Sequence, residues 1–103
     1  MVSEAEVLKF IQTLGDFSEE TIEGLRIFKS NDHIFLTLKP GSNPLRLEVR
    51  TDHNLRRLLI EQYESVLPSR SLGTAGLYVV ASGQLPGDEI LDLIRLSYNL
   101  SQA

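Results

Sequence analysis

Apolar residues near the start of the chain recur at intervals of three and four positions. The members of this series are Val7, Phe10, Ile11 and Leu14. Such spacing places one apolar stripe along an α-helix. Ser3 and Glu6 form the capping box that is typical of a helix start, and Gly15 supplies a stop. We therefore predict an amphipathic helix over residues 4–14, followed by a polar connection over residues 16–23.

The middle of the chain changes to a period of two, which is typical of half-buried strands. Apolar and polar residues alternate over residues 25–29, 34–39 and 45–50. Residues 30–32 and 40–44 between these runs are rich in turn-forming side chains. Because turns this short cannot return a strand in parallel, the pattern predicts an antiparallel three-stranded meander.

The second half of the chain alternates between helical and extended patterns. A helix is expected to begin at residues 51–52, and the helix or a short extended piece after it is expected to end at Pro68. The small residues of 69–76 predict a loop. The β-branched run at 77–81 is too short for a helix and predicts a fourth strand. A third helix is expected to start within residues 85–88, because apolar residues then recur at helical spacing.

The element order α-β-β-β-α-β-α predicts an α+β fold in a single domain over residues 1–103, with an antiparallel sheet and the helices packed on one face. Alternation then assigns each strand residue to the covered face or to the open face. The residues expected on the open face are Arg26, Phe28, Phe35, Thr37, Lys39, Arg46, Glu48 and Arg50. Two phenylalanine rings would therefore lie among cations in solvent.

Composition narrows the class of protein. The chain has 103 residues, enough for one hydrophobic core, and no cysteine. The absence of cysteine excludes disulfides, thiolate metal sites and thiol nucleophiles. No run of roughly 20 apolar residues could span a bilayer, and the first residues lack the basic and apolar stretches of a signal peptide. We therefore expect a cytoplasmic protein that does not bind membranes.

The ten Lys and Arg residues are unevenly distributed, although the net charge of the chain is −4. The formal charge is −5 over residues 1–25, +3 over residues 26–70 and −2 over residues 71–103. The middle of the chain holds eight of the ten cations. A basic surface on this acidic protein is therefore expected on the strands and the second helix.

Several segments of the second half resemble those of a known family. They are Leu45–Thr51, Leu58–Tyr63, Val66–Arg70, Gly83–Pro86 and Leu93–Tyr98, of which the Ser97–Tyr98 pair is the most specific element. On these segments the chain resembles the MmcQ/YjbR family of small bacterial proteins, which have a CyaY-like α+β fold, over residues 25–100. The resemblance implies a non-enzymatic domain of largely unknown cellular role, often described as DNA-binding through a double-wing arrangement of sheet and loops.

The expected open face supplies the candidate binding residues. Its cations and aromatic rings are Arg26, Phe28, Phe35, Lys39, Arg46, Arg50 and Tyr78, and Arg56, Arg57 and Arg70 would extend the strip. Arginine makes bidentate contacts to phosphate and aromatic rings stack on bases, so this face could bind DNA or single-stranded nucleic acid. The same cross-strand pairs are also ordinary stabilisers of a solvated sheet face. Exposed rings could equally form a homodimer or protein-partner patch, which is the alternative function.

Motifs for catalysis and for metal binding are missing from the sequence. There is no nucleophile elbow, P-loop or dinucleotide fingerprint, and the two histidines, His33 and His53, lie twenty residues apart. Their positions are more typical of turn and capping residues than of metal ligands. We expect no enzyme activity, no metal site and no cofactor, while a small-molecule or weak metal carrier stays as a third hypothesis.

Overall fold

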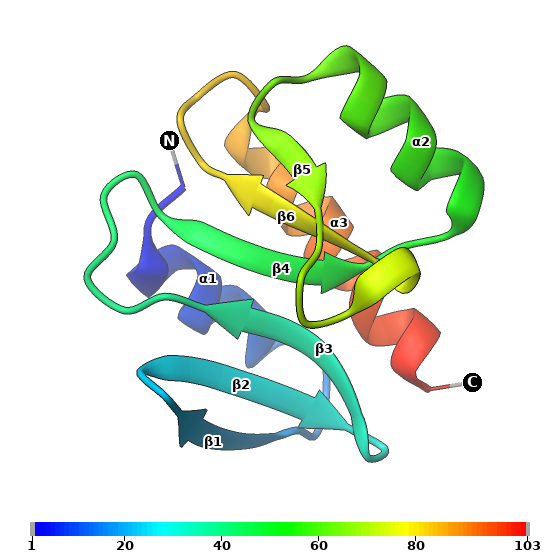
Figure 1. The fold of residues 1–103 in the computed structure, drawn as a ribbon. Helices are drawn as coiled ribbons and strands as arrows, with labels where there is room; N and C mark the ends of the chain where they lie inside the picture. Colours follow the sequence, from blue (N-terminus) through cyan, green and yellow to red (C-terminus); the bar gives the residue numbers. More distant parts are fainter. Residues whose placement is uncertain (1, 103) are drawn as a thin grey trace.

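Helices and strands form one sheet-and-helix assembly in the computed structural model, which describes residues 2–102. In chain order the elements are α1 (Glu4–Ile11), β1 (Ser18–Ile22), β2 (Leu25–Ser30), β3 (His33–Leu38), β4 (Arg46–Arg50), α2 (His53–Gln62), β5 (Val66–Pro68), the short 3₁₀-helix η1 (Gly73–Ala75), β6 (Gly76–Val80) and α3 (Gly87–Ser101). The strand order is β1-β2-β3-β4-β6-β5, and every neighbouring pair is antiparallel. In Figure 1, α1 and α3 lie behind the sheet and α2 lies beside β5. The predicted α+β fold is confirmed.

β1 and β5 form the two edges of the sheet, and β5 is the short extended piece that the sequence predicts to end at Pro68. β1 occupies most of the stretch 16–23, so the prediction of a connection there was wrong. All five residues of β1 are exposed, which leaves no alternation of apolar and polar positions to detect. The strand exists because its backbone pairs with β2, from Ser18 opposite Lys29 to Ile22 opposite Leu25. β5 has only three residues, too few for a period to be recognised.

The helices begin at the predicted caps. The Ser3 hydroxyl accepts a hydrogen bond from the Glu6 amide at 3.2 Å, and the Asp52 carboxylate accepts one from the Leu55 amide at 2.9 Å. α1 is shorter than predicted and ends at Ile11, after which the chain continues in turns. In the part of the chain that the structure describes, no helix is both long and apolar enough to cross a bilayer.

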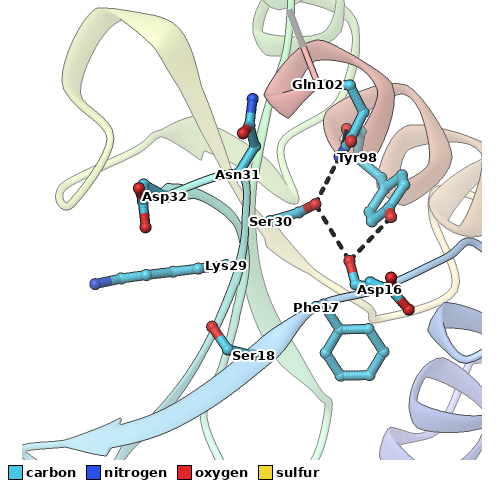
Figure 2. A pocket seen from close by; sticks show the side chains of 9 residues that line it. All are labelled: Asp16, Phe17, Ser18, Lys29, Ser30, Asn31, Asp32, Tyr98 and Gln102. Atoms are coloured by element: carbon cyan, nitrogen blue, oxygen red, sulfur yellow. Dashed lines mark hydrogen bonds between the residues drawn. The ribbon is translucent and has the colours of Figure 1, made fainter.

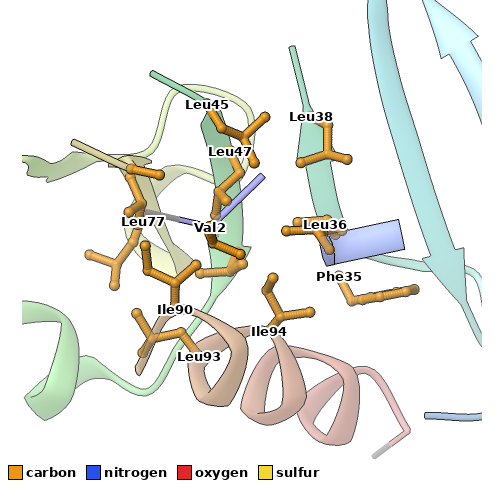
Figure 3. Packing of buried hydrophobic residues seen from close by; sticks show 14 of the residues in the cluster. Val2, Phe35, Leu36, Leu38, Leu45, Leu47, Leu77, Ile90, Leu93 and Ile94 are labelled. Atoms are coloured by element: carbon orange, nitrogen blue, oxygen red, sulfur yellow. The ribbon is translucent and has the colours of Figure 1, made fainter. Parts of the chain in front are cut away.

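The core lies between the sheet and helix α3. Figure 3 shows Ile90, Leu93 and Ile94 of α3 facing the strands that carry Leu36 and Leu47. These five side chains are at most 7 % exposed. α1 adds two buried residues of its own to the same cluster. The apolar stripes predicted for the first and third helices are therefore the surfaces that hold the helices on the sheet.

A β-bulge in β3 changes which residues face this core. Phe28 pairs with Leu36 across β2 and β3. The next pair joins Lys29 to Ile34, which leaves Phe35 as an extra residue. The bulge directs Phe35 and Leu36 toward the helices together, and Phe28 lies opposite them on the same face. Phe28 and Phe35 are both 0 % exposed, so the prediction that they lie on the open face was wrong.

The buried rings form an aromatic cluster under β2 and β3. The ring of Phe35 packs edge-on against Tyr98 of α3 with centroids 5.1 Å apart. Phe17 stands edge-on to Phe28 at 5.8 Å and to Phe35 at 6.1 Å. Such pairs stabilise by roughly 0.5–1.5 kcal/mol beyond the burial of their area. Phe28 and Phe35 therefore hold the sheet on α3 and offer no surface to a base or a partner.

Arg26 also lies on the covered side of the sheet, contrary to the prediction. The cross-strand register places it opposite Leu38, which is fully buried. Its guanidinium donates to Glu4 at 3.1 Å and to Glu19 at 2.6 Å. The same group lies over the ring of Phe28, 5.5 Å from its centroid. Arg26 is therefore a structural cation that joins β2 to α1 and β1.

Candidate functional site

The open face of the sheet carries a row of polar side chains at its centre. Thr37, Glu48 and Tyr78 are cross-strand neighbours on β3, β4 and β6. The loop between β5 and η1 crosses in front of β4 on this face, on the side away from α3 (Figure 1). Thr37 is 2 % exposed and Glu48 is 5 % exposed as a result. The predicted loop over residues 69–76 thus covers part of the face that was expected to lie open.

The carboxylate of Glu48 tethers this loop. Its Oε1 atom accepts hydrogen bonds from the Ser69 hydroxyl at 2.8 Å and from the Arg70 amide at 2.9 Å. Its Oε2 atom accepts one from the Thr37 hydroxyl at 3.1 Å and one from the Ser71 hydroxyl. A carboxylate in a buried position is stable only with such donors around it. Glu48 therefore fixes the position of the loop and of the backbone that carries the Arg70 side chain.

The environment of Glu48 keeps it ionised. Burial alone raises the pKa of this carboxyl group, but the hydrogen bonds from Ser71, Ser69 and the Arg70 amide lower it, and the resulting pKa lies below the ordinary value of 4.5. A carboxyl group with a lowered pKa is a poor proton donor at neutral pH. The chemistry of Glu48 thus suits a fixed anion that orders a loop.

A groove of about 400 Å³ opens beside the tether, and we call it the open-face groove. Its charged or aromatic lining residues are Glu23, Lys39, Arg46, Glu48, Arg70 and Tyr78. Lys39, Arg46 and Arg70 are exposed. None of the ion pairs found within residues 2–102 involves these three side chains. The groove therefore presents three cations to solvent.

The other predicted cations lie elsewhere. The Arg50 guanidinium donates to the Ile34 carbonyl, and the Arg56 guanidinium donates to the Gly76 carbonyl at 3.0 Å. Arg57 is exposed on α2 and is not part of the groove. Of the predicted site residues, the groove brings together Lys39, Arg46, Arg70 and Tyr78.

A second hollow, of about 460 Å³, lies between the start of β1, the β2–β3 turn and the end of α3 (Figure 2). Some of its polar groups bind one another. The Tyr98 hydroxyl donates to the Asp16 carbonyl at 3.0 Å, and the Ser30 hydroxyl donates to the same oxygen at 3.2 Å. The Gln102 amide donates to the Ser30 oxygen at 2.6 Å. These bonds fasten the end of α3 to β2 and to the segment before β1.

The structure brings no metal ligands together in the part of the chain that it describes. Within residues 2–102, no three His, Asp or Glu side chains lie close enough to hold a metal ion. His33 starts β3 and His53 starts α2, and both are exposed. The histidines therefore belong to separate elements.

Two residues of the site, Ser69 and Ser71, lie outside the predicted set, and Glu48 was expected in water. The sequence feature that could have indicated this loop is the run of small residues after Pro68. A loop that packs flat on a sheet leaves little room for large side chains. A Cβ atom added at Gly76 would lie 2.5 Å from the Cβ atom of Leu72. Gly76 therefore reflects close packing, whereas the sequence pattern predicted only a loop here.

Comparisons with known proteins show a structural likeness. No protein-family model matches the chain, and no curated protein is significantly similar to it in sequence. The chain is similar to the crystal structure of Deinococcus radiodurans protein DR2400, which contains a DUF419 domain, with a TM-score of 0.84 and 20 % identity over 93 % of this chain and 75 % of that chain. It is also similar to a protein from Pseudomonas syringae, with a TM-score of 0.78 and 18 % identity over 97 % of this chain and 99 % of that chain. These likenesses establish that the chain has the α+β fold of DUF419 structures.

Proposed function

We propose that this chain is a non-enzymatic domain of the MmcQ/YjbR type that binds single-stranded nucleic acid through the open-face groove. The observation that carries the proposal is the grouping of Lys39, Arg46 and Arg70 around one groove, with no ion-pair partner for them in residues 2–102. DUF419 is the MmcQ/YjbR-like family, so the likeness to DR2400 supports the family assignment.

Unpaired cations bind phosphate at a lower cost than paired ones. A cation held by a carboxylate must give up that contact before it contacts a phosphate, whereas Arg46 and Arg70 need only lose water. Each phosphate that is neutralised releases counterions, which supplies most of the favourable free energy of non-specific binding. Arginine adds two parallel hydrogen bonds to one phosphate group. The three cations of the groove are thus suited to binding the phosphates of a nucleic acid.

The shape of the groove favours a single strand over a duplex. Its volume of about 400 Å³ is that of a small ligand site. Tyr78 is half-buried in its lining and offers one aromatic ring. An unstacked base can enter such a hollow and lie against a ring, whereas a base inside a duplex is stacked on its neighbours. The groove is therefore expected to accept one splayed nucleotide at a time.

The alternative function, a homodimer or protein-interaction module, has less support from the edges of the sheet. β1 carries Glu19 and Glu20 near its middle, so two copies paired edge to edge would bring like charges together. β5 is three residues long and ends in Pro68, which has no N–H to donate. Phe28 and Phe35, the rings expected to form a partner patch, are buried. Nucleic-acid binding is therefore the function that we propose.

A pair of charge reversals tests the proposal. Arg46→Glu changes a groove residue, and Arg57→Glu makes the same change in net charge at an exposed site on α2. We expect Arg46→Glu to weaken the binding of a single-stranded oligonucleotide by about tenfold or more, and Arg57→Glu by less than about twofold. Fluorescence anisotropy over a salt series measures both effects. Arg46→Ala should also lower the slope of log affinity against log salt by about 0.7.

Two outcomes would contradict the proposal. Equal losses in the two charge reversals would mean that the oligonucleotide responds to overall charge and not to the groove. Absence of binding by the unmodified protein at low salt would remove the function altogether. Light scattering at several protein concentrations would then examine the alternative, for which a concentration-dependent dimer is the expected result.

A further inference from the structure

We infer that the open-face groove selects a terminal phosphate of a nucleotide, carried either by the end of a strand or by a free mononucleotide. This inference rests on the proposed function, because it names the part of the nucleic acid that the groove holds.

The three cations come from backbone segments that are held close to one another. The Lys39 amide donates to the Arg46 carbonyl at 3.1 Å, so these residues are neighbours at the ends of β3 and β4. The Arg70 amide donates to Glu48, which lies two residues beyond Arg46 on β4. All three side chains line the same hollow. The three cationic residues therefore border one hollow from three neighbouring segments of the chain.

This arrangement matches a phosphate monoester better than a diester. A monoester carries about −1.5 to −2 charges near neutral pH and has three acceptor oxygens. A diester inside a strand carries a single charge and fewer free oxygens. Two arginines and a lysine around one hollow can satisfy three oxygens at once. A phosphate backbone would instead be matched by cations spaced along the path of a strand.

The two carboxylates of the groove leave the cations available. Both oxygens of Glu48 accept hydrogen bonds from hydroxyl and amide groups, and neither contacts a cationic side chain within residues 2–102. Glu23 is exposed, so solvent and salt screen its charge. Competition for the cations from inside the groove is therefore small.

The size of the groove and the tethered loop favour an end over the middle of a strand. About 400 Å³ accommodates one nucleotide unit, with its base against Tyr78 and its phosphate among the cations. The loop that Glu48 tethers crosses the open face (Figure 1). Arg70 and Ser71 of this loop form part of the groove lining. An internal nucleotide would need an exit for the chain in two directions, whereas a terminal one needs only one.

The test compares strands that differ only at their ends. A short oligothymidylate is measured by isothermal titration calorimetry with a 5′-phosphate, with a 3′-phosphate and with neither. We expect at least one phosphorylated form to bind about tenfold more tightly than the unphosphorylated strand. Thymidine 5′-monophosphate should compete, and thymidine should not. The preference should disappear in Arg46→Glu and in the milder Arg46→Gln, and should persist in Arg57→Glu.

The outcomes separate this inference from the proposed function. Equal affinity for all three strands, together with loss of binding in Arg46→Glu, would overturn the inference and leave the proposed function in place. Failure of every strand to bind would overturn both. Competition by a phosphoserine peptide or by inorganic phosphate as strong as that by the mononucleotide would overturn the assignment to a nucleotide. Circular dichroism of each variant ensures that lost binding reflects a folded protein.

Discussion

The cations at the β1–β2 end of the sheet are paired with carboxylates. Arg26 is bonded to Glu4 and Glu19, and Lys29 pairs with Glu20 at 2.6 Å. The hydrogen bond from Arg26 holds the pKa of Glu19 below its ordinary value, and the same bond raises the pKa of Arg26. This end of the sheet uses its charges to attach β1 and α1 to β2.

The cations of the open-face groove differ in having no such partners. Lys39, Arg46 and Arg70 make none of the ion pairs found within residues 2–102. The difference follows from where the acidic residues near the start of the chain lie. Glu4 of α1 and Glu19 and Glu20 of β1 pair with the cations of β2, whereas Glu23, which lines the groove, makes none of the ion pairs found within residues 2–102. Cations therefore stabilise the fold at the β1–β2 edge and stay available in the groove.

The largest expected loss of stability comes from Phe35→Ala, which tests whether Phe35 belongs to the core or to the binding surface. The ring is 0 % exposed and contacts Phe17 and Tyr98. Phe35→Ala should lower the free energy of unfolding by about 3–5 kcal/mol, because it removes a large buried ring and leaves a cavity. Urea denaturation measures the loss. Leu58→Ala is the control, since Leu58 is 55 % exposed and should change stability by less than about 0.5 kcal/mol. Similar small losses in both variants would contradict the buried position of Phe35.

The position of Phe35 marks the limit of what alternation can predict about the sheet. The period of two correctly locates β2, β3 and β4, and the short β-branched run correctly locates β6. It fails at Phe35 because the bulge in β3 adds one residue to the count, and no glycine or proline marks that position. It fails for β2 because both alternating sets of that strand contain apolar residues, Leu25 and Ile27 in one and Phe28 in the other, so the pattern does not decide which set faces the core. It also fails for β1, whose residues are all exposed and whose strand depends on backbone pairing alone.

The next largest effect concerns the tether that places Arg70 in the groove. Glu48→Ala leaves the hydroxyls of Ser69 and Ser71 and the amide of Arg70 without their acceptor. We expect a loss of about 2–3 kcal/mol in stability, because buried donors then lack partners. Hydrogen exchange at the Arg70 amide should become faster. Thr37→Val removes only one donor and should cost about 1 kcal/mol. A Glu48→Ala protein with unchanged exchange and stability would show that the loop is held by other contacts.

A pH titration measures the charged state of the same tether. The folded-state pKa of Glu48 lies below 4.5, so the unfolded chain takes up a proton there first and stability falls as the pH drops through that value. Above pH 4.5 the stabilisation is fully present, and the stability gap between the unmodified protein and Glu48→Gln should be constant. Below it the gap should shrink, while Glu19 contributes a further loss in both proteins because its pKa is also lowered. Parallel stability curves over the acidic range would contradict a lowered pKa for Glu48.

The sequence predicts which residues line the groove better than it predicts which cations form ion pairs. It indicates the basic middle of the chain, and Lys39, Arg46, Arg70 and Tyr78 of the predicted set do line one groove. Which cations are neutralised depends on contacts between residues far apart in sequence, such as Arg26 with Glu4, and no local pattern records these contacts. The hydrogen bonds of Glu48 to the loop cannot be predicted from a local pattern either, because Glu48 and Ser71 are 23 residues apart.

The smallest effects on stability are expected for single arginine substitutions, one at the β1–β2 edge and one in the open-face groove. Arg26→Ala should cost about 1 kcal/mol, because it removes two partly exposed ion pairs and a cation–ring contact. Arg46→Ala should change stability by less than about 0.5 kcal/mol, since its side chain is exposed and makes no ion pair within residues 2–102. The order should reverse for oligonucleotide binding, which Arg46→Ala weakens and Arg26→Ala leaves nearly unchanged. Thermal denaturation and anisotropy of the same two proteins give both orders. A common order in the two measurements would mean that the β1–β2 edge and the open-face groove do not divide these roles.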